Sequence, residues 1–482
     1  MPSVKKNYLY SVAFQLLTIC MPLITSPYIS RVLGAEMLGT QTYCYSIANY
    51  FYIFAMLGVA NYGNRSIARV RDNKRELTKT FWTIYDFQLM RAGVMTLLYF
   101  LFVFIFFQQY RIIAFINGIY VFSSAIEISW FFFGLEEFKI TVIRNAVLKI
   151  LNTICIFIFV KSKSDLWIYS LLVCGSVVLT NASLWVFAKR YIGFYKPKLF
   201  ELLPHIKPEI VLFIPVISIS IYNVMDKVML GYMCTTTDVG YYNNAESIIT
   251  IPLGFITALG NVMMPHAANL IARKKEEQCK AEIEKSILFV MLVSCPMAFG
   301  VAGISNVFAP VYFGKNFLPC ATLMAWLAPK IVFCSWANVI RTQYLIPRNK
   351  DREYIISILA GAGINLLMNL CLIPHLAALG AVIGTICAEF TVAFMQTFFV
   401  RKQLPVRQYL FESIPFIAFG FFMFVCVRKI VEYFGVNVLS LLIGIISGIL
   451  IYITLVILFL LFSQKAGINQ IRSSIQEILK RK

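Results

Sequence analysis

Long stretches without charged residues are the feature that most constrains this chain. Residues 97–107, 150–160 and 438–462 contain no Asp, Glu, Lys or Arg. A helix needs about 20 apolar residues to cross a bilayer core of about 30 Å, because it rises about 1.5 Å per residue. Membrane-spanning strands would instead alternate apolar and polar residues, and no such alternation occurs. We therefore predict an all-α integral membrane protein.

The apolar stretches indicate about fourteen transmembrane helices. Of the 482 residues, 59% are hydrophobic and 14% are charged, which is more apolar than a soluble domain of this size can bury. The predicted spans are 11–30, 40–60, 80–107, 112–133, 142–160, 166–187, 209–233, 241–265, 286–310, 322–345, 354–373, 379–399, 410–427 and 437–462.

Basic residues alternate between the two sides of this predicted topology. With a cytoplasmic N-terminus, 32 of the 43 Lys and Arg residues lie in or beside cytoplasmic connections, and 7 lie on the other side. Connections rich in Lys and Arg stay in the cytoplasm, so we predict a plasma-membrane protein with both termini cytoplasmic. The net charge of +20 is dispersed between apolar stretches, and we expect no nucleic-acid partner.

Residues typical of metal and catalytic sites are sparse. The three histidines are far apart in the sequence, and the twelve cysteines include no CxxC pair. Neither a DxD pair nor the GxxxxGK[ST] phosphate-binding motif occurs. We predict no metal site, no cofactor and no catalytic residues.

The spans group into two halves separated by a proline-rich, basic connection. We predict a six-helix bundle over 1–190, a cytoplasmic linker over 191–208, a second six-helix bundle over 209–400, two additional helices over 401–462, and an amphipathic cytoplasmic tail over 463–482.

A short internal repeat supports the division into halves. Each half has a basic residue shortly before a Leu-Gly pair, ending at Gly34 and Gly231, and then a further glycine followed by tyrosines, at Gly39 and Gly240. Six spans before the linker would insert both halves in the same direction, giving a parallel repeat. A chance match of so few residues is the open alternative.

Three stretches carry a resemblance to the polysaccharide transporter family of oligosaccharide flippases, within the superfamily that includes the MATE multidrug antiporters. The stretches are residues 28–39 with 58–69, residues 226–231 with 239–243, and residues 369–374 with 379–389. The resemblance implies two helical bundles that face each other across a cavity and alternate between inward-open and outward-open states. It also implies an undecaprenyl-diphosphate-linked oligosaccharide as cargo, with a polysaccharide polymerase and chain-length machinery as partners beside the membrane lipids.

Several cations lie inside predicted spans, where a charge near the bilayer centre costs a few kcal/mol. We interpret Arg91, Lys227 and Lys330 as cavity residues that bind a diphosphate, because guanidinium and ammonium groups suit phosphate. Arg31 and Arg341 lie near span ends, where they either bind the cargo at the cavity mouth or extend toward the membrane surface.

Acidic residues share these spans. Asp226, Glu127, Glu246, Asp86 and Glu389 are candidates for binding a coupling H⁺ or Na⁺. The alternative is structural: opposite charges at one depth neutralise each other and hold helices together.

The function that the resemblance implies, and that the intramembrane cations favour, is lipid-linked oligosaccharide flipping. A cation-coupled multidrug or small-solute antiporter is the main alternative, and it would favour a compact cavity with one or two dominant carboxylates. A membrane-embedded glycosyltransferase or polymerase is less favoured, because no loop is large enough to form a catalytic domain.

Overall fold

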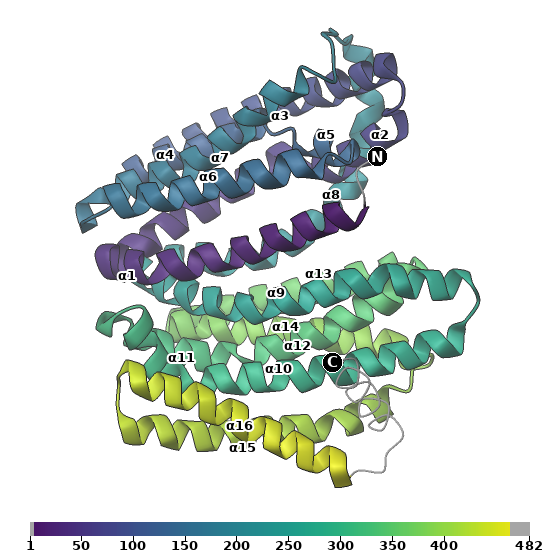
Figure 1. Cartoon of the computed structure of the whole chain (residues 1–482). Helices are drawn as coiled ribbons and strands as arrows, with labels where there is room; N and C mark the ends of the chain where they lie inside the picture. Colours follow the sequence, from purple (N-terminus) through teal and green to yellow (C-terminus); the bar gives the residue numbers. More distant parts are fainter. Residues whose placement is uncertain (1–3, 463–482) are drawn as a thin grey trace. The chain divides into compact units, whose positions relative to one another are not determined.

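A computed structural model describes residues 4–462, which form helices and short connections and contain no strand (Figure 1). The all-α prediction is confirmed. Helices are the favoured solution for such apolar sequences, because each backbone N–H and C=O is paired within its own segment. The tail predicted over 463–482 lies outside the described residues.

The chain divides into two compact units, residues 1–240 and residues 241–482. The division into bundles, linker and additional helices stays a prediction. Helix α8 nevertheless begins at Leu199, within the residues assigned to the linker. The helices of the first unit are α1 (Val4–Met56), α2 (Val59–Val70), α3 (Lys74–Phe106), α4 (Arg111–Phe122), α5 (Ser129–Gly134), α6 (Phe138–Phe159), α7 (Leu166–Ala188) and α8 (Leu199–Met233).

The first two predicted spans form one long helix with a kink. Gly34, inside α1, has a φ of 76° and a ψ of 172°, which interrupts the helical backbone between them. A positive φ is readily adopted by glycine because it lacks a Cβ. The kink therefore connects the predicted spans 11–30 and 40–60 in place of a loop.

Gly39 and Gly240, the two later glycines of the repeat, lie where α1 and α9 approach each other in the first unit. A Cβ on Gly39 would overlap the Thr236 carbonyl and lie 2.8 Å from the Gly240 nitrogen, and a Cβ on Gly240 would overlap the Ala35 carbonyl. Glycines allow helix backbones to approach this closely. The kinked part of α1 and the first turn of α9 (Thr236–Ala272) therefore cross in direct backbone contact.

The second unit contains the remainder of α9 and seven further helices. Helices α15 and α16 pack on α10 through a core that includes Val307, Val427 and Tyr452. The helices after α9 are α10 (Glu276–Tyr312), α11 (Leu318–Leu327), α12 (Pro329–Ile340), α13 (Asp351–Leu376), α14 (Ala378–Val400), α15 (Val406–Phe434) and α16 (Val438–Phe462).

Twelve segments of the described residues are long and apolar enough to cross a membrane. Helix α1 runs over 53 residues from Val4 to Met56 with the kink at Gly34, so each of its two parts is long enough to cross a bilayer. Helix α8, with 35 residues, is also long enough to cross. The prediction of about fourteen membrane-crossing helices is confirmed, and the chain is a multi-pass membrane protein.

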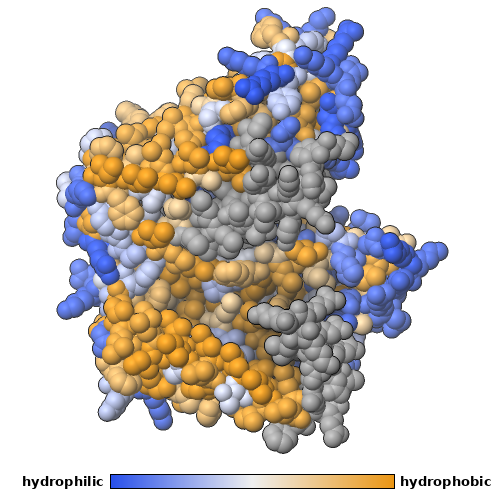
Figure 2. All heavy atoms as spheres, viewed as in Figure 1, coloured by the Kyte–Doolittle hydropathy of each residue, from blue (hydrophilic) through white to orange (hydrophobic). Residues whose placement is uncertain are grey.

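Exposed apolar side chains cover the outer faces of α15 and α16 (Figure 2). Phe421, Phe422, Ile446 and Leu450 are each more than half exposed. So continuous an apolar surface is unfavourable in water and matches the hydrocarbon of a bilayer.

Candidate functional site: buried charges among the helices

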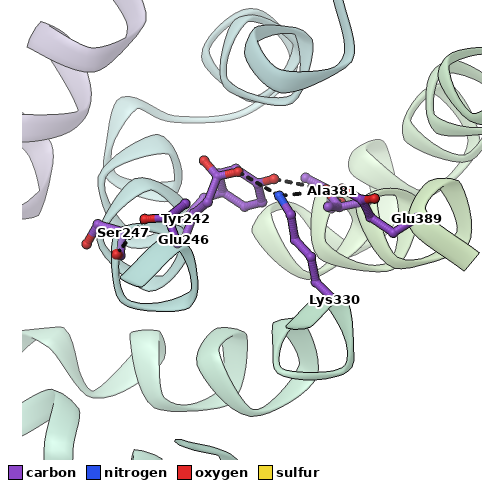
Figure 3. Close-up of polar contacts among 8 residues, drawn as sticks. Tyr242, Glu246, Ser247, Lys330, Ala381 and Glu389 are labelled. Carbon is purple, nitrogen blue, oxygen red and sulfur yellow. Dashed lines mark hydrogen bonds and ion pairs between the residues drawn. The ribbon is translucent and has the colours of Figure 1, made fainter. Parts of the chain in front are cut away.

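A buried ammonium group lies between two carboxylates in the second unit (Figure 3). The Nζ of Lys330 donates to Glu246 at 3.1 Å, and it lies 4.0 Å from a carboxylate oxygen of Glu389. The three side chains are 6%, 11% and 4% exposed, respectively. Three predicted site residues from α12, α9 and α14 therefore meet in one cluster.

Lys330 lies near the start of α12, and both of its described partners are acids on other helices. Pro329 begins α12, which places Lys330 in its first turn. One cation between two anions leaves a formal charge of −1 when both acids are ionised.

A neutral hydrogen bond between α9 and α14 lies beside this cluster (Figure 3). The hydroxyl oxygens of Tyr242 and Thr385 are 2.9 Å apart, and both side chains are buried. The Thr385 hydroxyl donates to the carbonyl of Ala381 at 3.0 Å, so the Tyr242 hydroxyl is the donor to Thr385. Both helices that supply the carboxylates are thus joined directly.

The first unit contains a different arrangement around Arg91, on α3. Its Nη1 donates to Glu209 of α8 in an ion pair whose side chains are 13% and 0% exposed. Within the described residues, the Nε and Nη2 of Arg91 and the Oε1 of Glu209 make no hydrogen bond. The guanidinium carbon lies 4.2 Å from the centre of the Phe87 ring, close enough for a cation–π contact.

Sequence reasoning missed Glu209. The predicted seventh span started at this residue, because Pro204 and Pro208 favoured a linker before it. Helix α8 instead begins ten residues earlier, at Leu199, which places Glu209 about 15 Å inside the helix. The usable signal was Glu201, whose carboxylate accepts from the Lys198 backbone N–H at 2.9 Å, as an acid in the first turn of a helix does.

Glu127, another predicted site residue, has a local structural contact. It lies between α4 and α5, is buried, and accepts a hydrogen bond from the Ser129 backbone N–H at 2.9 Å as well as one from the Ser129 hydroxyl. Its carboxylate therefore pairs the backbone N–H of the first residue of α5, one of the donors that a helix start leaves without an intrahelical partner.

The other predicted site residues lie on α1, α3, α8 and the turn after α12. Arg341 donates to Asn338 at 2.6 Å, one turn earlier along the chain. Asp86 is half-buried on α3, and Arg31 is exposed on α1. Asp226 is buried and Lys227 half-buried, next to each other on α8.

The chain is similar in sequence to several named proteins. The chain is 23% identical over 409 residues to the "Putative O-antigen transporter" of Escherichia coli strain K12, which covers 83% of this chain and 97% of that protein. It is 25% identical over 264 residues to the "Probable low-salt glycan biosynthesis flippase Agl15" of Haloferax volcanii, covering 52% of this chain and 53% of that protein.

Solved structures show the same fold. The structure titled "Lipid II flippase MurJ, inward closed conformation" superposes with a TM-score of 0.79 at 13% identity, covering 94% of this chain and 98% of that one. An inward-facing multidrug resistance MATE family transporter of the MOP superfamily gives a TM-score of 0.58 at 14% identity, covering 82% of this chain and 95% of that one. The expected MATE-like fold is confirmed.

The resemblance found in the sequence motifs is also confirmed at the level of the family. Residues 4–271, more than half of the chain, match the family described as "Polysaccharide biosynthesis protein". The chain belongs to this polysaccharide biosynthesis protein family.

Proposed function

We propose that this protein is a flippase for undecaprenyl-diphosphate-linked oligosaccharide repeat units in cell-surface polysaccharide biosynthesis. It moves them by alternating access from the cytoplasmic to the outer leaflet of the plasma membrane, with its own termini in the cytoplasm. The observation that carries this proposal is the alignment with an O-antigen transporter over 97% of that relative's length. The fold shared with a lipid II flippase and the apolar surface in Figure 2 support it.

The buried cations supply the chemistry that a diphosphate cargo needs. A diphosphate carries negative charge through an apolar region, where unpaired charges cost a few kcal/mol or more. Among the described residues Arg91 has N–H groups without hydrogen-bond partners, and guanidinium groups bind phosphate oxygens in pairs. In this proposal Arg91, Lys227 and Lys330 bind the cargo, and Arg31 and Arg341 receive it at the ends of the spans.

The cluster around Lys330 is the proposed site of energy coupling. Its formal charge of −1 is balanced by one H⁺ or one Na⁺ bound at Glu246 or Glu389. Asp226, Glu127 and Asp86 are further proposed coupling residues. The flipped repeat unit would then pass to a polysaccharide polymerase and its chain-length machinery, which act on the outer leaflet.

The experiment that tests the function is deletion of this protein in its host, followed by analysis of envelope lipids. We expect lipid-linked repeat units to accumulate in the cytoplasmic leaflet, and the wild-type protein to reverse this. Arg91→Gln and Lys227→Gln should insert into the membrane at wild-type levels yet fail to restore export. Arg75→Gln, an exposed arginine on α3, is the matched control and should restore it.

The alternatives give different results in the same experiment. Unchanged glycans combined with drug hypersensitivity would indicate a multidrug antiporter. Loss of a glycan product without accumulation of its lipid-linked precursor would indicate a membrane-embedded glycosyltransferase or polymerase. Wild-type export by both variants would remove Arg91 and Lys227 from the substrate path.

A further inference from the structure

The ion pair between Arg91 and Glu209 is incomplete on both sides. Only the Nη1 of Arg91 contacts the carboxylate, although a guanidinium can donate two parallel hydrogen bonds to one carboxylate. The remaining Nε and Nη2 groups and the free carboxylate oxygen are buried without partners among the described residues. Each unsatisfied buried polar atom is unfavourable, so Glu209 is a poor permanent partner for this arginine.

Two other contacts hold the start of α8 in place without the ion pair between Glu209 and Arg91. One turn before it, the ring nitrogen Nδ1 of His205 lies 2.6 Å from the Tyr62 hydroxyl of α2. Further toward the N-terminus, Glu201 forms an ion pair with Lys79 of α3 at 2.9 Å. Because these contacts anchor α8 to α2 and α3, Glu209 can leave Arg91 without detaching the helix.

We propose that Glu209 is a built-in competitor for Arg91, which occupies the guanidinium in place of the cargo's diphosphate. This inference rests on the proposed function. A diphosphate offers several charged acceptor oxygens, which can pair with the Nε and Nη2 donors that Glu209 leaves unused. Arrival of the diphosphate exchanges the partner of Arg91, and return of Glu209 releases the diphosphate. Glu209 is thus a specificity and release residue rather than a simple structural anchor.

The exchange predicts an unusual effect of removing a buried acid. Glu209→Gln should bind farnesyl diphosphate, a soluble polyprenyl diphosphate probe, about tenfold more tightly than the wild type, equivalent to about 1.4 kcal/mol. Release would slow for the same reason, so the export assay should show a lower apparent KM together with a lower kcat. The measurement is equilibrium binding to the full-length protein in lipid nanodiscs.

Control variants separate the competitor from a general charge effect. Glu76→Gln removes an exposed acid on α3 and should bind the probe like the wild type. Arg91→Gln should bind weakly, and Arg91→Gln combined with Glu209→Gln should bind no more tightly than Arg91→Gln, because Glu209 acts only through Arg91. Farnesol, which lacks the diphosphate, should show no difference between the wild type and Glu209→Gln.

The outcomes distinguish this inference from the proposed function. If neither the wild type nor Glu209→Gln binds farnesyl diphosphate, the diphosphate cargo itself is contradicted. If the wild type binds and Glu209→Gln binds equally or less tightly, Glu209 is a structural partner and the competitor role is overturned.

Two further measurements apply if Glu209→Gln does not fold. Glu209→Asp retains the charge but shortens the side chain, so it should bind the probe more tightly than the wild type, though by less than tenfold. In the wild type, farnesyl diphosphate should increase amide hydrogen exchange at residues 209–213, because the contact to Arg91 is lost, while residues 199–205 keep their contacts to α2 and α3. Unchanged or slower exchange at residues 209–213 would overturn the proposal.

Discussion

The two units bury cations in contrasting ways. Lys330 in the second unit lies between two carboxylates, whereas the described contacts of Arg91 in the first unit are one carboxylate and a ring, with N–H groups that no described residue pairs. The two acids neutralise the ammonium of Lys330, and one negative charge remains when both are ionised. A planar guanidinium with unused donors retains binding capacity. The contrast teaches that Arg91 can bind an anionic ligand with donors that the carboxylate leaves unused, whereas Lys330 can bind one only in exchange for a carboxylate.

The largest effect expected from this contrast is at Lys330. Lys330→Met leaves Glu246 and Glu389 facing each other without a cation, so the free energy of unfolding should fall by about 3–5 kcal/mol. SDS titration in mixed micelles measures this free energy of unfolding. Lys315→Met, at an exposed lysine of the same unit, should change the stability little. A loss at position 330 no larger than at position 315 would remove the distinction between the units.

A smaller loss is expected at Arg91. Arg91→Gln removes the one hydrogen bond to Glu209, a charged interaction that contributes about 1.5–3 kcal/mol. The same titration should therefore rank Arg91→Gln between Arg75→Gln and Lys330→Met. If Arg91→Gln destabilises the protein more than Lys330→Met, the first unit's pair is the stronger structural lock, contrary to our interpretation.

The two acids of the cluster should differ from each other. Glu246 is 3.1 Å from Lys330 and Glu389 is 4.0 Å away. Glu246→Gln should therefore cost about 1.5 kcal/mol, while Glu389→Gln should be close to neutral because it removes the excess negative charge. Paired unfolding measurements test the difference. Equal losses would mean that Lys330 is shared evenly between the acids.

The smallest effect should come from the neutral contact beside the cluster. Tyr242→Phe removes the buried hydrogen bond to Thr385, which is worth about 1 kcal/mol. Tyr241→Phe is the matched control: its hydroxyl donates to the Asn316 carbonyl at an exposed position, and it should cost less. If both variants are equally stable, the second unit derives its rigidity from the charges alone.

Particular residues show how far the sequence could predict the site. Lys330 and Glu246 both lie inside predicted spans, and they do meet. Arg91 also lies inside a predicted span, but the structure pairs it with Glu209, which was not among the candidates. Depth follows from position along a helix, whereas a pairing also depends on the rotation of each helix and on its neighbours.

The sequence by itself determined the all-helical membrane architecture, the approximate number of crossings and the family. These follow from local properties, because uncharged stretches of sufficient length have few alternatives in a bilayer. Only the tertiary structure decided that Gly34 kinks α1, that α8 begins at Leu199, and that Lys330 meets two carboxylates while Arg91 meets one. The ion pairs join residues on separate helices, in one case more than a hundred positions apart, so they form only when the helices pack.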